Sequence, residues 1–180
     1  GELKLSQFQN ELSLNRQDQA LANIQEGVLP KRGMTQALLA PETCLPPQPV
    51  EISAWFQSDI DDDKKRAVQC VLGASDISVI EGPPGTGKTK LIAEIILQYQ
   101  RQNPNSKILL ASQTNIAVDH ALAKVSEVVL SNDAGGISEL HMVRLGDPNF
   151  NKIAESSYPY LIDSAITKWR DQAKIESQRF

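Results

Sequence analysis

Residues 82–89 read Gly-Pro-Pro-Gly-Thr-Gly-Lys-Thr and match the pattern GxxxxGK[ST] of a phosphate-binding loop. The loop follows the apolar, β-rich residues 77–80 and precedes a periodicity over residues 88–99 that is typical of a helix. The motif requires this order of strand, loop and helix, because backbone N–H groups at the start of a helix converge on phosphate oxygens. The stretch therefore predicts an α/β fold built around a site for nucleotide phosphates.

Each residue type in this loop has an expected role in holding a nucleoside triphosphate, which we take to be ATP. The glycines allow the backbone to bend so that successive N–H groups face the phosphates. Lys88 is expected to reach the β- and γ-phosphate oxygens, and the Thr89 hydroxyl is expected to bind Mg²⁺, so these two residues form the predicted catalytic pair. A glycine-rich turn with a chance lysine is disfavoured by the surrounding pattern. The expected ATP-binding residues are Gly82, Pro83, Pro84, Gly85, Thr86, Gly87, Lys88 and Thr89.

Alternating apolar runs and helical periodicities predict a parallel sheet with flanking helices. Strands are expected at residues 77–80, 108–111 and 140–145, and helices at residues 88–99 and 117–130. Helices of this length between consecutive strands specify parallel pairing with right-handed crossovers. The strand over residues 108–111 is expected to be buried. The buried side of the first helix is expected to carry Leu91, Ile92, Ile95, Ile96 and Tyr99.

Helical patterns also flank this region. Apolar spacings of three and four predict a helix over residues 3–26, with Leu21 in its narrow apolar stripe and Gly27 at its end. A helix is expected over residues 159–179, and the two are expected to pair as a stalk. A shorter helix is expected from Asp61 to Gly73. The expected divisions are residues 1–28 (stalk-like helix), 29–54 (proline-rich, extended linker), 55–150 (partial sheet domain) and 151–180 (C-terminal helix).

Composition narrows the class of protein. The net charge of −4 argues against a chain coated in positive charge, although a local basic groove is compatible with it. Cys44 and Cys70 lack metal-ligand spacing and are interpreted as reduced thiols, which favours a cytosolic or nuclear protein. No apolar run is long enough to cross a bilayer, and the sequence does not open with a basic region followed by an apolar one, so we do not expect a secreted protein. The chain starts without methionine and stops inside a helical pattern, so we expect a fragment of a longer protein.

Hydrolysis of the nucleotide needs an acidic pair at the end of a second strand, which holds magnesium and polarises the attacking water. No Asp-Glu dipeptide occurs in the 180 residues. The runs that end at Asp133 and Asp163 are interpreted as chance matches, because one crosses polar residues and the other lies in a helical pattern. We therefore expect this chain to bind nucleotide better than it hydrolyses it.

Three stretches together resemble the first RecA-like domain of superfamily 1 helicases, in the branch of the nonsense-mediated decay RNA helicase. The first is the loop at residues 82–89, in a form that AAA+ ATPases share. The second, LLASQTNIAVD at residues 109–119, resembles motif Ia of that branch. The third, VRLG at residues 143–146, resembles a short strand further along. The resemblance covers residues 55–150, and the flanking helices resemble the stalk that supports an accessory domain.

This resemblance implies a motor driven by ATP and Mg²⁺ that moves on single-stranded RNA or DNA, with a second RecA-like domain as its partner. It places Thr114 and Asn115 near the nucleic-acid backbone, where hydroxyl and amide groups bond phosphate and sugar without reading sequence. Simple helix capping by Thr114 or Asn115 is the alternative, and the two roles are compatible. Lys64 stands where the family has glutamine, which puts adenine selectivity in question because lysine only donates.

Two other features are interpreted structurally. The acidic residues 61–63 are interpreted as a charged helix start rather than a metal site, because acids in the first turn are favoured by the helix dipole. His120 follows Asp119 as in metal-dependent phosphohydrolases, but it is interpreted as a surface residue, because no further ligands stand at suitable spacing.

Two other functions stay open from the sequence. By resemblance to its family, an AAA+-type ATPase that remodels proteins should show its acidic strand end near residues 141–146, and Arg144 in the middle of that stretch disfavours it. A nucleotide-binding module without hydrolysis, acting through its stalk helices, is kept open by the missing acidic pair. Stimulation of ATP turnover by single-stranded nucleic acid separates the helicase from both.

Overall fold

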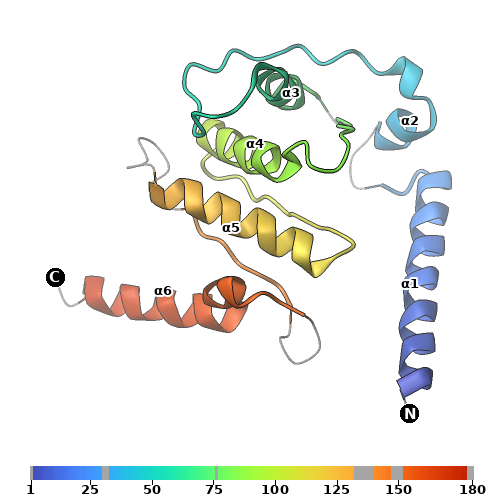
Figure 1. The fold of residues 1–180 in the computed structure, drawn as a ribbon. Coiled ribbons are helices and arrows are strands. Elements are labelled where there is room, and N and C mark those ends of the chain that lie inside the picture. Colours follow the sequence, from blue (N-terminus) through green and yellow to red (C-terminus); the bar gives the residue numbers. More distant parts are fainter. Residues whose placement is uncertain (1, 30–32, 76, 132–139, 147–151, 178–180) are drawn as a thin grey trace. The chain divides into compact units, whose positions relative to one another are not determined.

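The structure is a computed structural model that describes residues 2–29, 33–75, 77–131, 140–146 and 152–177. The chain divides into two compact units (Figure 1). One consists of Gly1–Pro47 with Ala74–Ser78, and the other of Gln48–Gly73 with Val79–Phe180. All regular elements of the described residues are helical.

The first unit contains α1 (Glu2–Gln25), α2 (Met34–Leu39) and the 3₁₀ turn η1 (Pro41–Thr43). α1 confirms the predicted N-terminal helix. It ends where expected, because Gly27 takes φ +70° and lets the Val28 N–H bond to the Asn23 carbonyl at 2.8 Å. Leu21 is 58% exposed, so the apolar stripe is not buried at this position.

The linker prediction is wrong over α2. Residues 34–39 form a helix, although an extended linker was expected from the many prolines of residues 29–54. The prolines stand outside this stretch, so the chain is free to make a helical turn there. The predicted pairing of α1 with the C-terminal helix involves two different units and stays a prediction.

In the second unit, α4 (Lys88–Gln102) packs against both α3 (Asp62–Leu72) and α5 (Asn115–Ser131), as Figure 1 shows. α3 has the predicted limits: the Asp61 carboxylate accepts a hydrogen bond from the Lys64 N–H at 2.9 Å, and Gly73 follows the last turn. Two apolar clusters form the core. One contains Ala93, Leu97, Val125 and Val128, and the other contains Ile60, Val68 and Leu91.

The buried face of α4 differs from the predicted one. Tyr99 is 43% exposed, so its predicted burial is wrong, and Ile92, Ile95 and Ile96 are only half-buried. Apolar periodicity located the face about one position away from where the helix packs. The buried residues of α4 are Leu91, Ala93, Glu94, Leu97 and Gln98.

Glu94 is fully buried because it serves as a multiple hydrogen-bond acceptor. Its carboxylate accepts from the backbone N–H groups of Phe56 at 3.0 Å and Gln57 at 3.2 Å. It also accepts from the side chains of Gln57 at 3.1 Å and Gln98 at 2.8 Å. A buried charge is tolerated when its oxygens are satisfied in this way. Glu94 thus ties the segment before α3 to the middle of α4.

The three predicted strands form no ladder among the described residues. Residues 77–80, 108–111 and 140–145 are not helical. Within the described part of the chain, the one β-contact is an isolated parallel bridge between Arg144 and Leu161. Leu109 is 83% exposed, so the predicted burial of residues 108–111 is wrong in this structure. The parallel sheet is therefore not confirmed.

The chain continues with the 3₁₀ segment η2 (Glu155–Tyr160) and α6 (Ile162–Ser177). The predicted C-terminal helix begins later than residue 159, because Pro159 lies inside η2. Asp163 is in the first turn of α6, as its helical pattern indicated, and Asp133 lies outside the described residues. Among the described helices, none combines the length and apolar character needed to cross a membrane.

Candidate functional site

The glycine loop opens α4 as predicted. Gly87 is the residue before the helix and takes φ +79°, a left-handed conformation that residues with a Cβ adopt only at a cost. Gly85 has a similar φ of +82°. With these two bends the chain passes from an extended entry directly into the first turn of α4, so its early N–H groups lack helical acceptors. Such N–H groups are suited to anions.

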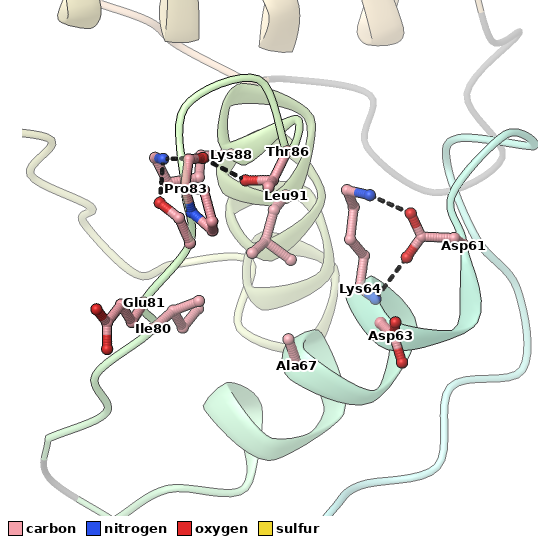
Figure 2. Close-up of a pocket in the computed structure, with 11 residues that line it drawn as sticks. Asp61, Asp63, Lys64, Ala67, Ile80, Glu81, Pro83, Thr86, Lys88 and Leu91 are labelled. Atoms are coloured by element: carbon pink, nitrogen blue, oxygen red, sulfur yellow. Dashed lines mark hydrogen bonds and ion pairs between the residues drawn. The ribbon is translucent and has the colours of Figure 1, made fainter.

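Lys88 folds back over its own loop. Its Nζ donates to the carbonyl oxygens of Gly82 at 2.5 Å and Pro83 at 2.8 Å (Figure 2). The Thr86 hydroxyl also donates to the Pro83 carbonyl, at 2.9 Å. The ammonium group is therefore held at the mouth of the loop, which is the place where a polyphosphate tail needs a cation. Thr89 follows in the first turn of α4 and is half-buried.

A cavity of about 440 Å³ lies between the loop and the first turns of α3 (Figure 2). Ligand sites for nucleotide-sized molecules commonly have volumes of a few hundred Å³. The residues that line the cavity are Asp61, Asp63, Lys64, Ala67, Ile80, Glu81, Gly82, Pro83, Thr86, Lys88 and Leu91.

Lys64 reaches this cavity from α3. It forms an ion pair with Asp61, and its Cε would stand 3.1 Å from a Cβ placed on Gly87. The hydrogen bond from Lys64 lowers the pKa of Asp61 below its ordinary value. The sequence position at which the family carries glutamine thus lies against the phosphate-binding loop. Asp61, Asp62 and Asp63 begin α3, which agrees with their interpretation as a charged helix start.

The second motif begins α5. The Thr114 hydroxyl accepts from the Ala117 N–H at 3.4 Å, as a helix cap does, so the capping interpretation is supported for Thr114. Asn115 uses its side chain differently: its Oδ1 accepts from Arg144 Nη2 at 3.0 Å. His120, one turn further, is exposed as predicted.

A buried ion pair joins the second and third motifs. Arg144 Nε donates to Asp119 Oδ1 at 2.8 Å, and the two residues are 8% and 1% exposed. The other carboxylate oxygen accepts from the Ala154 N–H at 2.9 Å. Burial by itself raises the pKa of Asp119, but the hydrogen bonds from Arg144 and Ala154 outweigh it and hold the pKa below its ordinary value.

Sequence reasoning missed both this pair and Glu94. The available signal was a charged residue inside an apolar run: Arg144 stands between Val143 and Leu145, and Glu94 stands among the isoleucines of α4. Charged residues are rarely fully buried unless they are paired. Each such position therefore indicated that a partner exists, but not which residue it is.

Comparison with known proteins identifies the family. A model of the AAA domain family AAA_11 matches residues 59–179, and it continues through α6 beyond the predicted domain end at residue 150. The DNA-binding protein SMUBP-2 of Rattus norvegicus is 27% identical over 173 residues, which are 96% of this chain and 16% of that protein.

Two helicases are also similar. The DNA polymerase alpha-associated DNA helicase A of Saccharomyces cerevisiae is 35% identical over 98 residues, 54% of this chain and 14% of the relative. An uncharacterized ATP-dependent helicase of Methanocaldococcus jannaschii is 32% identical over 112 residues, 61% of this chain and 16% of the relative. The chain thus spans 14–16% of the length of these proteins.

The loop and the family match define a P-loop NTPase domain. The chain belongs to the AAA_11 family of AAA domains, because the match covers more than half of it. Two of the similar proteins are named helicases, and the motifs at residues 82–89 and 109–119 resemble those of superfamily 1 helicases, so this resemblance is confirmed.

Proposed function

We propose that this chain is the nucleotide-binding part of an ATP-driven helicase or translocase motor that moves on single-stranded RNA or DNA. The observation that carries the proposal is the loop at residues 82–89, which opens α4 and holds the Lys88 ammonium at its mouth. The helicase names of the similar proteins support the same class. Because the chain spans a small part of those proteins, the second RecA-like domain and the catalytic acidic pair belong to the rest of the full-length protein in this proposal.

ATP is the proposed ligand of the loop and the adjoining cavity. Lys88 exchanges the Gly82 and Pro83 carbonyl oxygens for the β- and γ-phosphate oxygens, which bind an ammonium more strongly because they are charged. The Thr89 hydroxyl is a hard oxygen next to the same phosphates, which is the type of ligand that Mg²⁺ requires. When bound, Mg²⁺ neutralises charge on the β- and γ-phosphates. Thr89 and Lys88 then hold the nucleotide in one orientation.

The extended segments at residues 77–80 and 108–111 are proposed strands of a parallel sheet. They are apolar yet exposed, with Val79 at 88% and Leu109 at 83%. Apolar extended backbone of this kind is stable in a folded domain when neighbouring strands pair with it and helices cover it. Each segment leads into one of the two motifs, and parallel sheets place their ligands beyond the carboxyl ends of the strands.

Thr114 and Asn115 are proposed to contact the nucleic-acid backbone. They lie just after the second extended segment, at the start of α5. Hydroxyl and amide groups bond phosphate and sugar oxygens and are indifferent to the base, which suits a motor that moves along any sequence. The capping bond of Thr114 is compatible with this role, since a hydroxyl has two acceptor lone pairs and one donor.

The test is ATP turnover by the full-length protein, measured without nucleic acid and with single-stranded RNA and DNA. A helicase motor is expected to turn over ATP several-fold faster with nucleic acid, and Lys88→Ala is expected to abolish both rates. Turnover that does not respond to nucleic acid would indicate an AAA+-type ATPase. ATP binding without any turnover would indicate a nucleotide-binding module. Either result overturns the proposal.

A further inference from the structure

Arg144 makes two directed hydrogen bonds to α5. Its Nε donates to Asp119 Oδ1 at 2.8 Å, and its Nη2 donates to Asn115 Oδ1 at 3.0 Å. Asn115 and Asp119 stand one helical turn apart, so the planar guanidinium group spans that turn. The arrangement links the first residue of α5 to a buried charge.

The backbone of Arg144 is also held in place. The Arg144 backbone N–H donates to the Tyr160 carbonyl at 2.6 Å, and Arg144 pairs with Leu161 in a parallel bridge. Asp119 is held in turn by the Ala154 N–H at 2.9 Å. Since Arg144 is 8% exposed and Asp119 is 1% exposed, neither group has room to rotate freely. Arg144 is therefore a fixed donor toward Asn115.

A fixed donor determines which way the Asn115 amide points. Arginine has only N–H donors, so the amide must turn its oxygen toward Arg144 and its NH₂ group away. The flipped orientation would set two donor groups against each other. Within the described part of the chain, Asn115 Nδ2 donates to no acceptor, and the residue is partly exposed. The amide thus presents a donor at the start of α5, and phosphate and sugar oxygens are acceptors.

We propose that Arg144 is a positioning residue, which locks the Asn115 amide so that its NH₂ group donates to the backbone of a bound single-stranded nucleic acid. This inference rests on the proposed function, because it needs nucleic acid at Asn115. It explains why an arginine stands in the middle of the apolar run at residues 143–145. A leucine there would fill the space but would leave the amide free to rotate and Asp119 without its counter-charge.

The variant Asn115→Asp tests the NH₂ donor of Asn115 without lowering the stability of the folded domain. Aspartate keeps the bond to Arg144 and is favourable in the first turn of a helix, so the melting temperature should not fall. It replaces the donor by a negative oxygen, so affinity for a single-stranded oligonucleotide should fall by about tenfold or more in the full-length protein. If Asn115 has a purely structural role, Asn115→Asp should bind the oligonucleotide with unchanged affinity. That result would overturn the inference.

A double-mutant cycle tests Arg144 itself. Arg144→Lys keeps a charge beside Asp119 but cannot form the fork to both residues. It is expected to weaken nucleic-acid binding about as much as Asn115→Ala, and the double variant Arg144→Lys with Asn115→Ala should bind no more weakly than Asn115→Ala alone. An additive loss would show that Arg144 acts independently of Asn115 and would overturn the inference.

The same experiments distinguish the two levels of the proposal. If single-stranded nucleic acid stimulates the wild-type protein but Asn115→Asp and Arg144→Lys bind it normally, only the positioning role is wrong. If the wild-type protein neither binds single-stranded nucleic acid nor responds to it, the proposed function is wrong and the positioning role falls with it.

Discussion

Gln57 is bonded to Glu94 twice, through its backbone N–H at 3.2 Å and its side-chain Nε2 at 3.1 Å. Both residues are buried, and the same carboxylate also accepts from Gln98 at 2.8 Å. The Glu94 carboxylate therefore joins the chain before α3 to the centre of α4. Because α3 and α4 border the candidate nucleotide cavity, these hydrogen bonds help to keep the two helices in place around it.

We expect Glu94→Ala to destabilise the domain strongly. The change removes the carboxylate that accepts four hydrogen bonds. Each buried donor left unsatisfied costs about 1–3 kcal/mol. The free energy of unfolding in urea should therefore fall by about 3 kcal/mol or more. Glu94→Gln is the matched control, because it keeps the shape and one acceptor oxygen. Its NH₂ group faces two of the N–H donors, so stability should still fall, but by less than in Glu94→Ala. Equal losses of unfolding free energy for the two variants would contradict the role of the Glu94 hydrogen bonds in joining these segments.

The local parts of this domain could be predicted from the sequence. The limits of α3 followed from the acidic start at residues 61–63 and from Gly73 at its end, and the start of α4 followed from the glycine loop. These signals act between residues that are a few positions apart in the sequence. A short segment therefore contains all the residues that determine where each helix begins or ends. The phosphate-binding residues could be predicted for the same reason, because the motif that predicts them is one continuous loop.

The non-local parts could not be predicted. Glu94 and Asp119 are buried because partners 37 and 25 residues away satisfy them, and no periodicity shows which residues will meet. The expected strands at residues 77–80 and 108–111 depend on neighbours in a ladder, and the described residues supply none. Tyr99 was placed in the core by its spacing alone, although the packing of α4 is set by α3 and α5 on either side.

Lys88→Ala is expected to abolish detectable ATP binding by the 180-residue chain. The ammonium group makes the charge-assisted contacts to the phosphates, and losing such contacts costs about a hundredfold in affinity. Calorimetry with ATP and Mg²⁺ measures this directly. Thr89→Val should instead remove the dependence of ATP affinity on Mg²⁺, because valine keeps the shape but has no hydroxyl. Lys107→Ala is the control, since Lys107 is exposed and lies outside the cavity lining; an equal loss there would indicate a general effect of charge.

Lys64→Gln is expected to increase selectivity for adenine. Lys64 lines the cavity against Gly87, and an amide at this place both donates and accepts toward a base edge, whereas lysine only donates. A paired amide contact discriminates bases by about tenfold, so the ratio of ATP to GTP affinity should rise by that amount. Lys65→Gln provides a control on the same helix, because Lys65 pairs with Asp62 away from the cavity. A ratio that moves equally in both variants would count against a base contact by Lys64.

Asp119 should make the stability of the domain sensitive to acid. Its pKa in the folded chain lies below the ordinary value of 3.8, so the unfolded chain takes up the proton first as the pH falls. The stabilisation is therefore complete above about pH 5 and is lost as the pH falls through the folded-state pKa.

Asp119→Asn removes the negative charge beside buried Arg144, and breaking a buried pair costs about 3–5 kcal/mol near neutral pH. Urea unfolding between pH 7 and pH 3 should show the difference between wild type and Asp119→Asn shrinking toward low pH. Among the described residues, Arg144 is the charged group paired with this carboxylate, so a constant difference across the pH range would mean that the ion pair does not contribute.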